Sequence, residues 1–335
     1  MGSHLVGKLR SSGAFVRALV RDTSKAKLME QTGAEIVQGD LLDYNCDRLL
    51  RRAASGMDVV FHCAAKVSDW ASRDEYIDVN VEGTENILKA SLAEGVGRFV
   101  HLSSCEVYGN PGRENITESA RVVYGQHSYT DSKIEAEDLV WKYHDLYELP
   151  AVILRPSTIY GPGANYIFDE IADLILNKRL ILINKGEAKA RLCYVENLVD
   201  AMIIAATHDD AVGQVYNVSD GCKTTWREVY EKIDNILKSS VLESSFTYRF
   251  SLPYIFAYLY SSVMEYAARI FQMSKRPRAT RMGCRLTGID QSFSIEAIRK
   301  LGFEPKVGFE KGIKRFGRWM LGEIRKPRDS EGGEK

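Results

Sequence analysis

The feature that most constrains the fold is a regular alternation, through the first half of the chain, of short apolar runs with helix-length segments. Three of the runs read DVVFHC (58–63), RFVHLS (98–103) and PAVILR (150–155). Almost continuous apolar runs are expected of strands that helices cover on both faces. Because strands that alternate with helices of this length form βαβ units, the pattern predicts a doubly wound parallel sheet of the α/β class.

The predicted elements follow this rhythm up to Pro156 and less regularly beyond it. The predicted strands cover residues 14–20, 34–37, 58–63, 98–103, 150–155, 179–183 and 213–218. The predicted helices cover residues 24–32, 43–54, 74–95, 128–147, 166–177, 193–206 and 224–238. The last helix is expected to begin at Thr224 or Thr225, since threonine often caps a helix. The polar segment 325–335 is predicted to be a disordered tail.

Composition narrows the classes of function. Lys plus Arg and Asp plus Glu both number 45, so the chain lacks the basic excess of a general nucleic-acid binder. Its six cysteines are scattered without a C-x-x-C pair, so we expect no metal site, no disulfide framework and reduced thiols in a cytoplasmic protein. The first ten residues have no apolar signal segment. Residues 251–273 are apolar but include Glu265 and Arg269, so they are poorly suited to span a membrane.

Tyr129 and Lys133 lie in the segment YTDSK at the start of a predicted helix. Residues four apart stand one turn apart on the same face of a helix. A nearby ammonium lowers the pKa of a phenol, so Tyr129 could exchange a proton with a substrate hydroxyl or carbonyl group. In a chain with 17 tyrosines, one such spacing could also arise by chance on a solvated helix face.

Ser104 follows the apolar run that ends at Leu102, in the segment LSSCEVYG. A serine at the carboxyl end of a parallel strand points into the crevice where ligands bind in this class of fold. Ser104 could hold the reacting oxygen beside Tyr129, or it could only bond to local backbone. We predict a catalytic set of Ser104, Tyr129 and Lys133.

These segments resemble the extended short-chain dehydrogenase/reductases, also called the NAD-dependent epimerase/dehydratase family, from Gly2 to about Phe316. Further segments match in order: Gly39-Asp40-Leu41, His62-Cys63-Ala64-Ala65, Asn80 to Thr84, Leu154-Arg155-Pro156, Tyr194 to Asn197 and Tyr216-Asn217-Val218. The resemblance implies an NAD(P)-binding Rossmann domain over 1–160 and a smaller substrate lobe over 161–320, from which residues 190–220 return to the sheet. It also implies a homodimer formed through helices 74–95 and 128–147.

The resemblance assigns residues to a nicotinamide cofactor. They are Gly2, Arg21, Lys25, Asp40, Leu41, Ala64, Ala65, Lys66, Asn80, Tyr129, Lys133 and Pro156. Arg21 with Lys25 resembles the pattern of NADP-using dihydroflavonol-reductase-like members, and an arginine there can accommodate a 2′-phosphate. We therefore favour NADP over NAD, although the adjacent Asp22 could take the role of the acid that favours NAD.

The chain departs from the family at its start. Members of the family begin with a strand and T-G-x-x-G-x-x-G, whereas here only Gly2 matches, at the last glycine. That turn brings backbone N–H groups to the pyrophosphate. We therefore expect the first strand and most of the glycine motif to be missing from this sequence, through a truncated gene model or an internal start. The alternative is a natural paralogue that does not bind the cofactor.

The family contains epimerases, dehydratases and reductases, so the fold does not decide the reaction. The family's dehydratases have S-T-D-E at the end of the strand that corresponds to residues 98–103. In this chain Cys105 replaces the aspartate and Glu106 remains, which disfavours dehydration. The segment AAKVSDW resembles members that act on 3β-hydroxysteroids and β-hydroxy or β-keto acids. The expected substrate residues are Trp70, Cys105, Glu106, Ser157 and Arg281. We predict oxidoreduction of a secondary alcohol or ketone in an apolar small molecule; the alternatives are a nucleotide-sugar epimerase and a non-catalytic binding protein.

Apolar residues recur at helical spacing between Leu252 and Phe271. Such a stripe is most often core or the wall of a pocket, but it could also rest on a membrane surface as a peripheral contact. Five basic residues follow it: Lys275, Arg276, Arg278, Arg281 and Arg285. They could bind the diphosphate of a sugar nucleotide, meet anionic lipid, or form a solvated loop.

Overall fold

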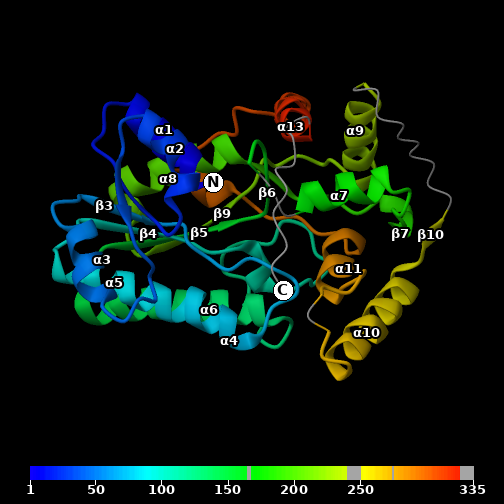
Figure 1. Ribbon diagram of the computed structural model, residues 1–335, viewed down its shortest axis with the longest axis horizontal. Helices are drawn as coiled ribbons and strands as arrows, with labels where there is room; N and C mark the ends of the chain where they lie inside the picture. The colour runs from blue at the N-terminus through cyan, green and yellow to red at the C-terminus, as the bar shows by residue number, and fades with distance from the viewer. Residues whose placement is uncertain (164–166, 240–249, 274, 325–335) are drawn as a thin grey trace.

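The computed structural model of the 335-residue chain describes residues 1–163, 167–239, 250–273 and 275–324. The tail predicted to be disordered, 325–335, therefore lies outside the described residues. Parallel strands occupy one side of the molecule and a mainly helical lobe occupies the other (Figure 1).

The central sheet is parallel and lies on the side of the molecule opposite the helical lobe. Its strand order is β3 (Val59–His62), β4 (Arg98–Leu102), β5 (Ala151–Pro156) and β9 (Gln214–Val218). β1 (Arg17–Val20) and β2 (Glu35–Gln38) form a separate parallel pair. In the described part of the chain, no strand joins β1 to β3. The predicted doubly wound α/β class is confirmed.

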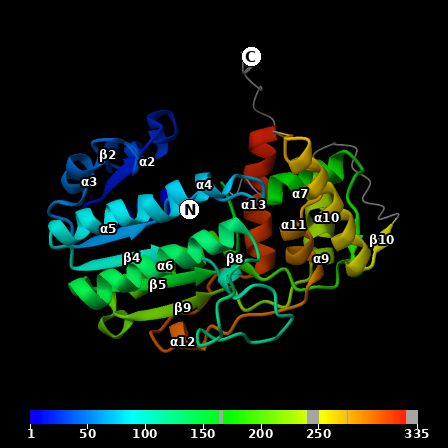
Figure 2. The same ribbon diagram turned by 90° about the horizontal axis from the view of Figure 1, so that it is seen from below.

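Helices cover both faces of the sheet because alternate strand residues point to opposite sides. On one face, Val100, Val152 and Leu154 pack against α8 (Val195–Thr207). On the other face, Phe99 and Ile153 pack with residues of α3 (Cys46–Ala54), α5 (Gly83–Ala93) and α6 (Ser128–Tyr147). Figure 2 shows α5 and α6 running alongside the strands.

The predicted helix over 128–147 is confirmed at both ends. The predicted helix over 74–95 is divided: α4 (Arg73–Tyr76) and α5 are joined by a π-helical turn, η2 (Ile77–Glu82). π-helical turns are often found at functional sites. The predicted helix over 24–32 is also divided, into the 3-10 turn η1 (Thr23–Lys25) and α2 (Lys27–Gln31).

Two predictions in the second half were wrong in part. The segment predicted as a helix from 193 begins as β8 (Leu192–Tyr194), which pairs with β6 (Thr158–Tyr160) before α8 starts. Its residues are fully buried and apolar, so helix and strand could not be distinguished by periodicity. The strand predicted over 179–183 is confined to β7 (Leu182–Ile183), which pairs with β10 (Ser251–Leu252).

The helical lobe has its own core. Phe168 of α7 (Ile167–Leu176), Trp226 of α9 (Trp226–Lys238) and Phe316 of α13 (Phe309–Ile324) are fully buried in it. Thr225 caps α9 by accepting a hydrogen bond from the Glu228 backbone N–H, as one of the two expected threonines. The remaining helices of the described chain are α1 (Gly2–Ser11), α10 (Tyr254–Ile270), α11 (Arg281–Gly288) and α12 (Glu296–Arg299). No helix among the described residues is both long enough and apolar enough to cross a bilayer.

Candidate active site

Ser104 and Tyr129 meet where β4 ends. Ser104 directly precedes the 3-10 turn η3 (Cys105–Tyr108), and its Oγ accepts a hydrogen bond from the Glu106 backbone N–H at 3.2 Å. Tyr129 lies in the first turn of α6, and its phenol is close enough to the Ser104 hydroxyl for that hydroxyl to influence its pKa. Two segments separated by two dozen residues therefore bring both hydroxyls to the carboxyl edge of the sheet, where ligands bind in this class of fold.

Burial dominates the electrostatics of this pair and of Lys133. It raises the pKa of Tyr129 above its ordinary value, and the nearby Ser104 hydroxyl opposes that change. Burial also lowers the pKa of Lys133 to about 8, against the opposing charge of Glu137. The Lys133 Nζ donates to the Leu102 carbonyl oxygen at 2.7 Å. Lys133 is thus anchored to the end of β4, one helical turn beyond Tyr129.

His127 fixes the start of the catalytic helix, and the sequence analysis did not identify it. Its Nδ1 accepts a hydrogen bond from the Tyr129 backbone N–H at 3.1 Å, so the proton of the neutral ring is on Nε2. That Nε2 lies 3.3 Å from the Asp69 carbonyl oxygen, and burial lowers the pKa of the imidazole. Helix caps are usually Ser, Thr, Asp or Asn, so a histidine gave no signal for this role.

Asn80 ties the loop after β3 to the catalytic helix. It lies on the π-helical turn η2 and is almost fully buried. Its Oδ1 accepts from the Lys66 backbone N–H at 2.7 Å, while its Nδ2 donates to the Lys66 carbonyl oxygen and to Ser132 Oγ at 3.2 and 2.9 Å. The amide is therefore engaged by the protein, and it fixes the backbone at Lys66, one of the residues that the sequence analysis assigned to the cofactor.

A buried ion pair, also absent from the sequence analysis, joins β5 to α6. Arg155 Nη2 lies 2.5 Å from a Glu137 carboxylate oxygen, and both side chains are less than one-tenth exposed. Glu137 also accepts a hydrogen bond from Ser103, and Arg155 donates to the Tyr108 hydroxyl at 2.8 Å. Tyr108 in turn donates to Asn217 Oδ1 on β9 at 2.7 Å. This network holds the carboxyl ends of three strands and α6 in one arrangement.

The residues assigned to the adenosine side of a cofactor lie at the ends of β1 and β2. Arg21 is exposed, and its guanidinium lies 3.6 Å from Asp40. Asp22 accepts hydrogen bonds from the backbone N–H and the hydroxyl of Ser24, as the cap of η1. Lys25 lies in η1, and Leu41 is buried against α5, where its carbonyl accepts from Asn86 at 2.9 Å.

The other assigned cofactor residues extend along the same edge of the sheet. Ala64 and Ala65 follow β3 and are exposed and half-buried, respectively, while Pro156 ends β5 and is buried. Gly2 begins α1 in open space, because a Cβ there would meet no atom within 4 Å. This edge of the sheet offers the exposed Arg21 cation, two small alanine side chains and several strand ends, which fit a dinucleotide with phosphate groups. Gly2 makes no close approach that requires glycine.

The expected substrate residues differ in their surroundings. Cys105 is buried, and its thiol donates to the Arg155 carbonyl oxygen at 2.9 Å, so we expect no direct contact with substrate. Glu106 lies 3.9 Å from Arg191, a buried arginine that the sequence analysis missed. The Ser157 Oγ has no hydrogen-bond partner among the described residues. Glu106 and Ser157 therefore remain candidates for the substrate side.

Trp70 lies at a contact between the sheet domain and the helical lobe, and Arg281 joins two helices within the lobe. The guanidinium of Arg269 lies 5.9 Å from the Trp70 ring centre. Beside Trp70, the buried Asp69 carboxylate binds the Arg276 guanidinium, which also reaches Glu170 at 2.6 Å. Arg281 is paired with Glu265 at 2.7 Å. These charges are compensated within the protein, so Arg281 is not a free cation for a diphosphate.

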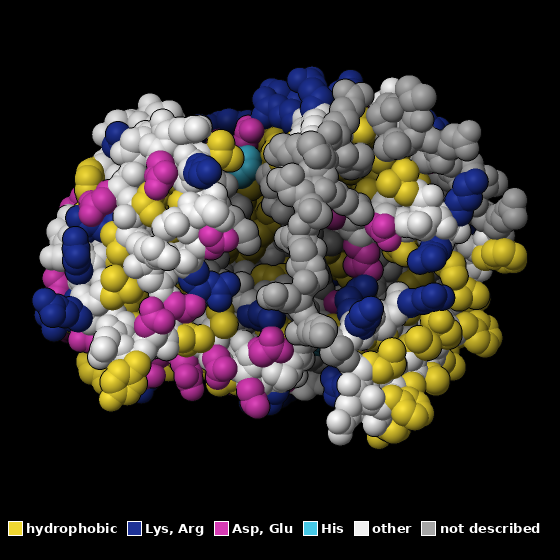
Figure 3. Space-filling model, in the orientation of Figure 1, with side chains coloured by type: hydrophobic (Ala, Val, Ile, Leu, Met, Phe, Trp, Pro, Cys, Tyr) yellow, Lys and Arg dark blue, Asp and Glu magenta, His cyan; other side chains and the backbone are white. Residues whose placement is uncertain are grey.

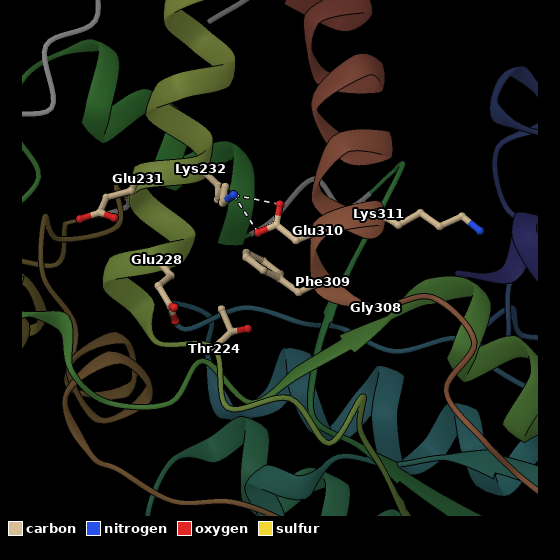
Figure 4. Close-up of a pocket in the computed structure, with 8 residues that line it drawn as sticks. All are labelled: Thr224, Glu228, Glu231, Lys232, Gly308, Phe309, Glu310 and Lys311. Atoms are coloured by element: carbon tan, nitrogen blue, oxygen red, sulfur yellow. Dashed lines mark hydrogen bonds and ion pairs between the residues drawn. The ribbon is translucent and has the colours of Figure 1, made fainter.

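A groove of about 680 Å³ lies elsewhere, between α9 and α13 (Figure 4). In that view Lys232 reaches across to Glu310, and the two are paired at 2.7 Å. The residues that line the groove are Thr224, Glu228, Glu231, Lys232, Gly308, Phe309, Glu310 and Lys311. None of them belongs to the candidate active site.

Comparison with known proteins identifies the family. The sequence model of the "NAD dependent epimerase/dehydratase family" matches residues 1–219 of this chain. The chain is 28% identical over 297 residues to the 2-alkyl-3-oxoalkanoate reductase of Stenotrophomonas maltophilia, covering 86% of this chain and 87% of that protein. It is 31% identical over 236 residues to the 3 beta-hydroxysteroid dehydrogenase/Delta 5-->4-isomerase of Mycobacterium tuberculosis, covering 66% and 62%.

The fold is shared with solved enzymes. The UDP-glucuronic acid 4-epimerase of Bacillus cereus, solved in complex with NAD, superposes with a TM-score of 0.73 over 96% of this chain and 95% of that one, at 19% identity. The family match covers Ser104, which follows β4, and the helix that carries Tyr129 and Lys133. This chain therefore belongs to the NAD-dependent epimerase/dehydratase family of extended short-chain dehydrogenase/reductases, and it is an enzyme of that family.

Proposed function

We propose that the protein reduces a ketone, or oxidises the corresponding secondary alcohol, in an apolar β-hydroxy/keto or steroid-like substrate, with NADP as cofactor. The observation that carries the proposal is that the Tyr129 phenol and the Ser104 hydroxyl lie close together at the carboxyl edge of the sheet. Two hydroxyls in this arrangement can bind one carbonyl oxygen from two sides.

In the reductive direction, Ser104 holds the substrate oxygen and Tyr129 donates its proton to it. A reduced nicotinamide held at the strand ends would supply the hydride, so that the carbonyl would gain one hydride and one proton and become an alcohol. Lys133 follows Tyr129 by one helical turn, and we assign to its ammonium the role of favouring the phenolate that Tyr129 becomes, because an ammonium stabilises the charged form of a phenol. Burial of Tyr129 keeps the phenol protonated until the substrate oxygen takes the proton.

The substrate class follows from what the site lacks and from the relatives. The buried thiol of Cys105 stands where a dehydratase would have a carboxylic acid, which argues against dehydration. The two curated relatives are named as a 2-alkyl-3-oxoalkanoate reductase and a 3 beta-hydroxysteroid dehydrogenase/isomerase. Both names describe a keto or hydroxy group on a mainly hydrocarbon molecule, which supports an apolar substrate.

The preference for NADP rests on the end of β1. Asp22 is turned into its own loop as the cap of η1, so it is not the acid that would grip a ribose 2′-hydroxyl. The Arg21 side chain is 72% exposed and contacts Asp40 only at 3.6 Å, which leaves it able to meet a 2′-phosphate.

The test is NADPH consumption with a 2-alkyl-3-oxoalkanoate and with a 3-ketosteroid, followed by absorbance. Tyr129→Phe removes the proton donor, so kcat should fall by a factor of about 10² to 10⁴. Tyr124→Phe is a matched control, because Tyr124 is exposed and its hydroxyl donates to Asp138. Full activity in Tyr129→Phe would contradict the proposal, as would turnover of neither substrate by the wild type.

A nucleotide-sugar epimerase is the second candidate, and Arg191 is the observation that favours it. Its side chain is 1% exposed and lies 3.9 Å from Glu106, and its Nε has no hydrogen-bond partner among the described residues. A buried cation close to the Ser104 side of the site could bind a diphosphate. Binding of UDP-glucose or UDP-glucuronic acid that is lost in Arg191→Gln, without NADPH consumption, would favour this candidate.

A further inference from the structure

α10 turns its apolar face outward, whereas an ordinary surface helix turns its apolar face toward the core. The residues that it turns inward are small or polar: Ala257, Ser261, Glu265 and Ala268. Its outward residues are large and apolar, and each is more than half exposed; we call them the outer face of α10. They are Ile255, Phe256, Leu259, Tyr260, Val263, Tyr266, Ile270 and the adjoining Phe271. A contiguous exposed apolar surface of this kind marks a binding site for a partner or a membrane.

Figure 3 shows this outer face as a band of hydrophobic side chains along the lower right margin of the molecule, where Figure 1 places α10. Lys and Arg side chains lie beside the band in the same view. α10 lies at the margin of the lobe in Figure 1, and the large exposed fractions of its apolar side chains show that they face outward.

The charge around the outer face is of one sign. Residues 250–285 contain one acidic side chain, Glu265, which is buried and paired with Arg281. The same segment contains six basic residues: Arg269, Lys275, Arg276, Arg278, Arg281 and Arg285. Lys275 and Arg278 are exposed and form no ion pair within the described part of the chain, whereas the Arg269 guanidinium lies over the Trp70 ring. An occupant of this surface should therefore be apolar and negatively charged at its boundary.

We propose that the outer face of α10 binds the surface of an anionic membrane, with the helix axis in the plane of the bilayer. α10 has 17 residues and, like the other described helices, is not suited to cross a bilayer. Its aliphatic and Phe side chains enter the acyl boundary, and the Tyr260 and Tyr266 hydroxyls remain at the level of the headgroups. Lys275 and Arg278 meet the lipid phosphates.

Charge distinguishes this occupant from a second copy of the chain. A two-fold contact through the outer face would bring another segment with a basic excess and no exposed acid to this one. The two exposed cations, Lys275 and Arg278, would then lack counter-charges, whereas an anionic lipid surface supplies them.

Contacts of α10 also place the membrane close to the candidate active site. Arg285 donates to the Tyr258 hydroxyl of α10 at 2.9 Å and to the Gln126 carbonyl oxygen, next to the helix cap His127, at 3.1 Å. On the proposed function, an apolar substrate dissolved in lipid would thus have a short path to Tyr129. Membrane binding itself does not depend on that step.

The test is co-sedimentation of the full chain with vesicles of phosphatidylcholine alone, or of equal parts phosphatidylcholine and phosphatidylglycerol. The wild type should bind the anionic vesicles and bind the neutral ones more weakly. Val263→Asp places a charge in the middle of the outer face and should reduce binding at least about tenfold. Leu146→Asp, at an exposed apolar residue of α6, is the matched control and should bind like the wild type.

Removing exposed charges gives a second, independent readout. Lys275→Gln with Arg278→Gln should weaken binding to anionic vesicles about 25-fold, at about fivefold for each cation, and leave binding to neutral vesicles unchanged. Arg48→Gln with Arg52→Gln removes two exposed arginines of α3 and should have no such effect. Failure to bind either vesicle would overturn the proposal, as would equal binding by all variants. A dimer that Val263→Asp dissociates, without vesicle binding, would assign the face to a second copy. None of these readouts requires catalytic activity.

Discussion

Lys133 provides a prediction in which stability and activity move in opposite directions. Its ammonium is buried in the site, and burial lowers its pKa from 10.5 to about 8. The difference corresponds to about 3 kcal/mol by which the fold disfavours the charged form. We predict that Lys133→Met abolishes turnover and, at neutral pH, raises the free energy of unfolding by about 1 to 2 kcal/mol. The gain is smaller than 3 kcal/mol because the hydrogen bond to the Leu102 carbonyl is lost.

The pH dependence gives the sharper form of this prediction. Since the pKa of Lys133 is lower in the folded than in the unfolded protein, the unfolded state binds more protons between about pH 8 and pH 10.5. The wild type therefore gains stability from this group as the pH rises through that window, and Lys133→Met does not. The difference in unfolding free energy between variant and wild type should fall by about 2 kcal/mol between about pH 7.5 and pH 10.

Urea denaturation followed by circular dichroism measures both proteins across this range. Other groups that titrate, including the many tyrosines, are common to both proteins and cancel in the difference. A difference that stays constant with pH would refute the reasoning that burial suppresses the charge of Lys133. Lys133→Arg should neither have the added stability of Lys133→Met nor recover activity, because its guanidinium stays charged at every pH used.

Three further predictions concern groups around the site. Burial lowers the pKa of His62 to about 3, so the unfolded state binds more protons than the folded state below pH 6.5. The free energy of unfolding of the wild type therefore falls as the pH falls. In His62→Gln, this fall between about pH 7 and pH 5, measured by denaturation, should be smaller by about 2 kcal/mol. Glu137→Gln leaves Arg155 as a buried unpaired charge and should lower the free energy of unfolding by about 3 to 5 kcal/mol, and an unchanged value would contradict the role given to that pair. His127→Ala removes the side chain to which the Tyr129 backbone N–H donates. We expect the free energy of unfolding to fall by about 1 kcal/mol, and kcat to fall with little change in KM. His127→Asn should largely restore both the stability and kcat.

The sequence predicted well those features that depend on local pattern. The helix 128–147 was predicted residue for residue, because it is long and begins just after a loop. The strand that ends at Leu102 was predicted from its apolar run, and with it the position of Ser104. Ser104 and Tyr129 could be paired in advance only through the family resemblance, since nothing local links a strand end to a helix 25 residues later.

Features that depend on distant contacts could not be predicted. Glu137 and Arg155 form a buried pair across α6 and β5, but each residue alone is typical of a solvated surface. Asp69 and Arg276 meet although 207 positions separate them. β8 is three residues long and leads directly into α8, so its apolar residues could be read as the first turn of that helix. In each case the partner, rather than the local sequence, decides the role.

Transfer of isotope from the cofactor tests the central claim most directly. The protein would be incubated with NADPH carrying deuterium at the transferred position and with a 2-alkyl-3-oxoalkanoate, and the product analysed by mass spectrometry. The account predicts a hydroxy acid with one deuterium on the new carbinol carbon, formed by the wild type and by Tyr124→Phe but not by Tyr129→Phe. An unlabelled product, or label transfer that persists in Tyr129→Phe, would contradict the assignment of Ser104 and Tyr129 as the site of reduction.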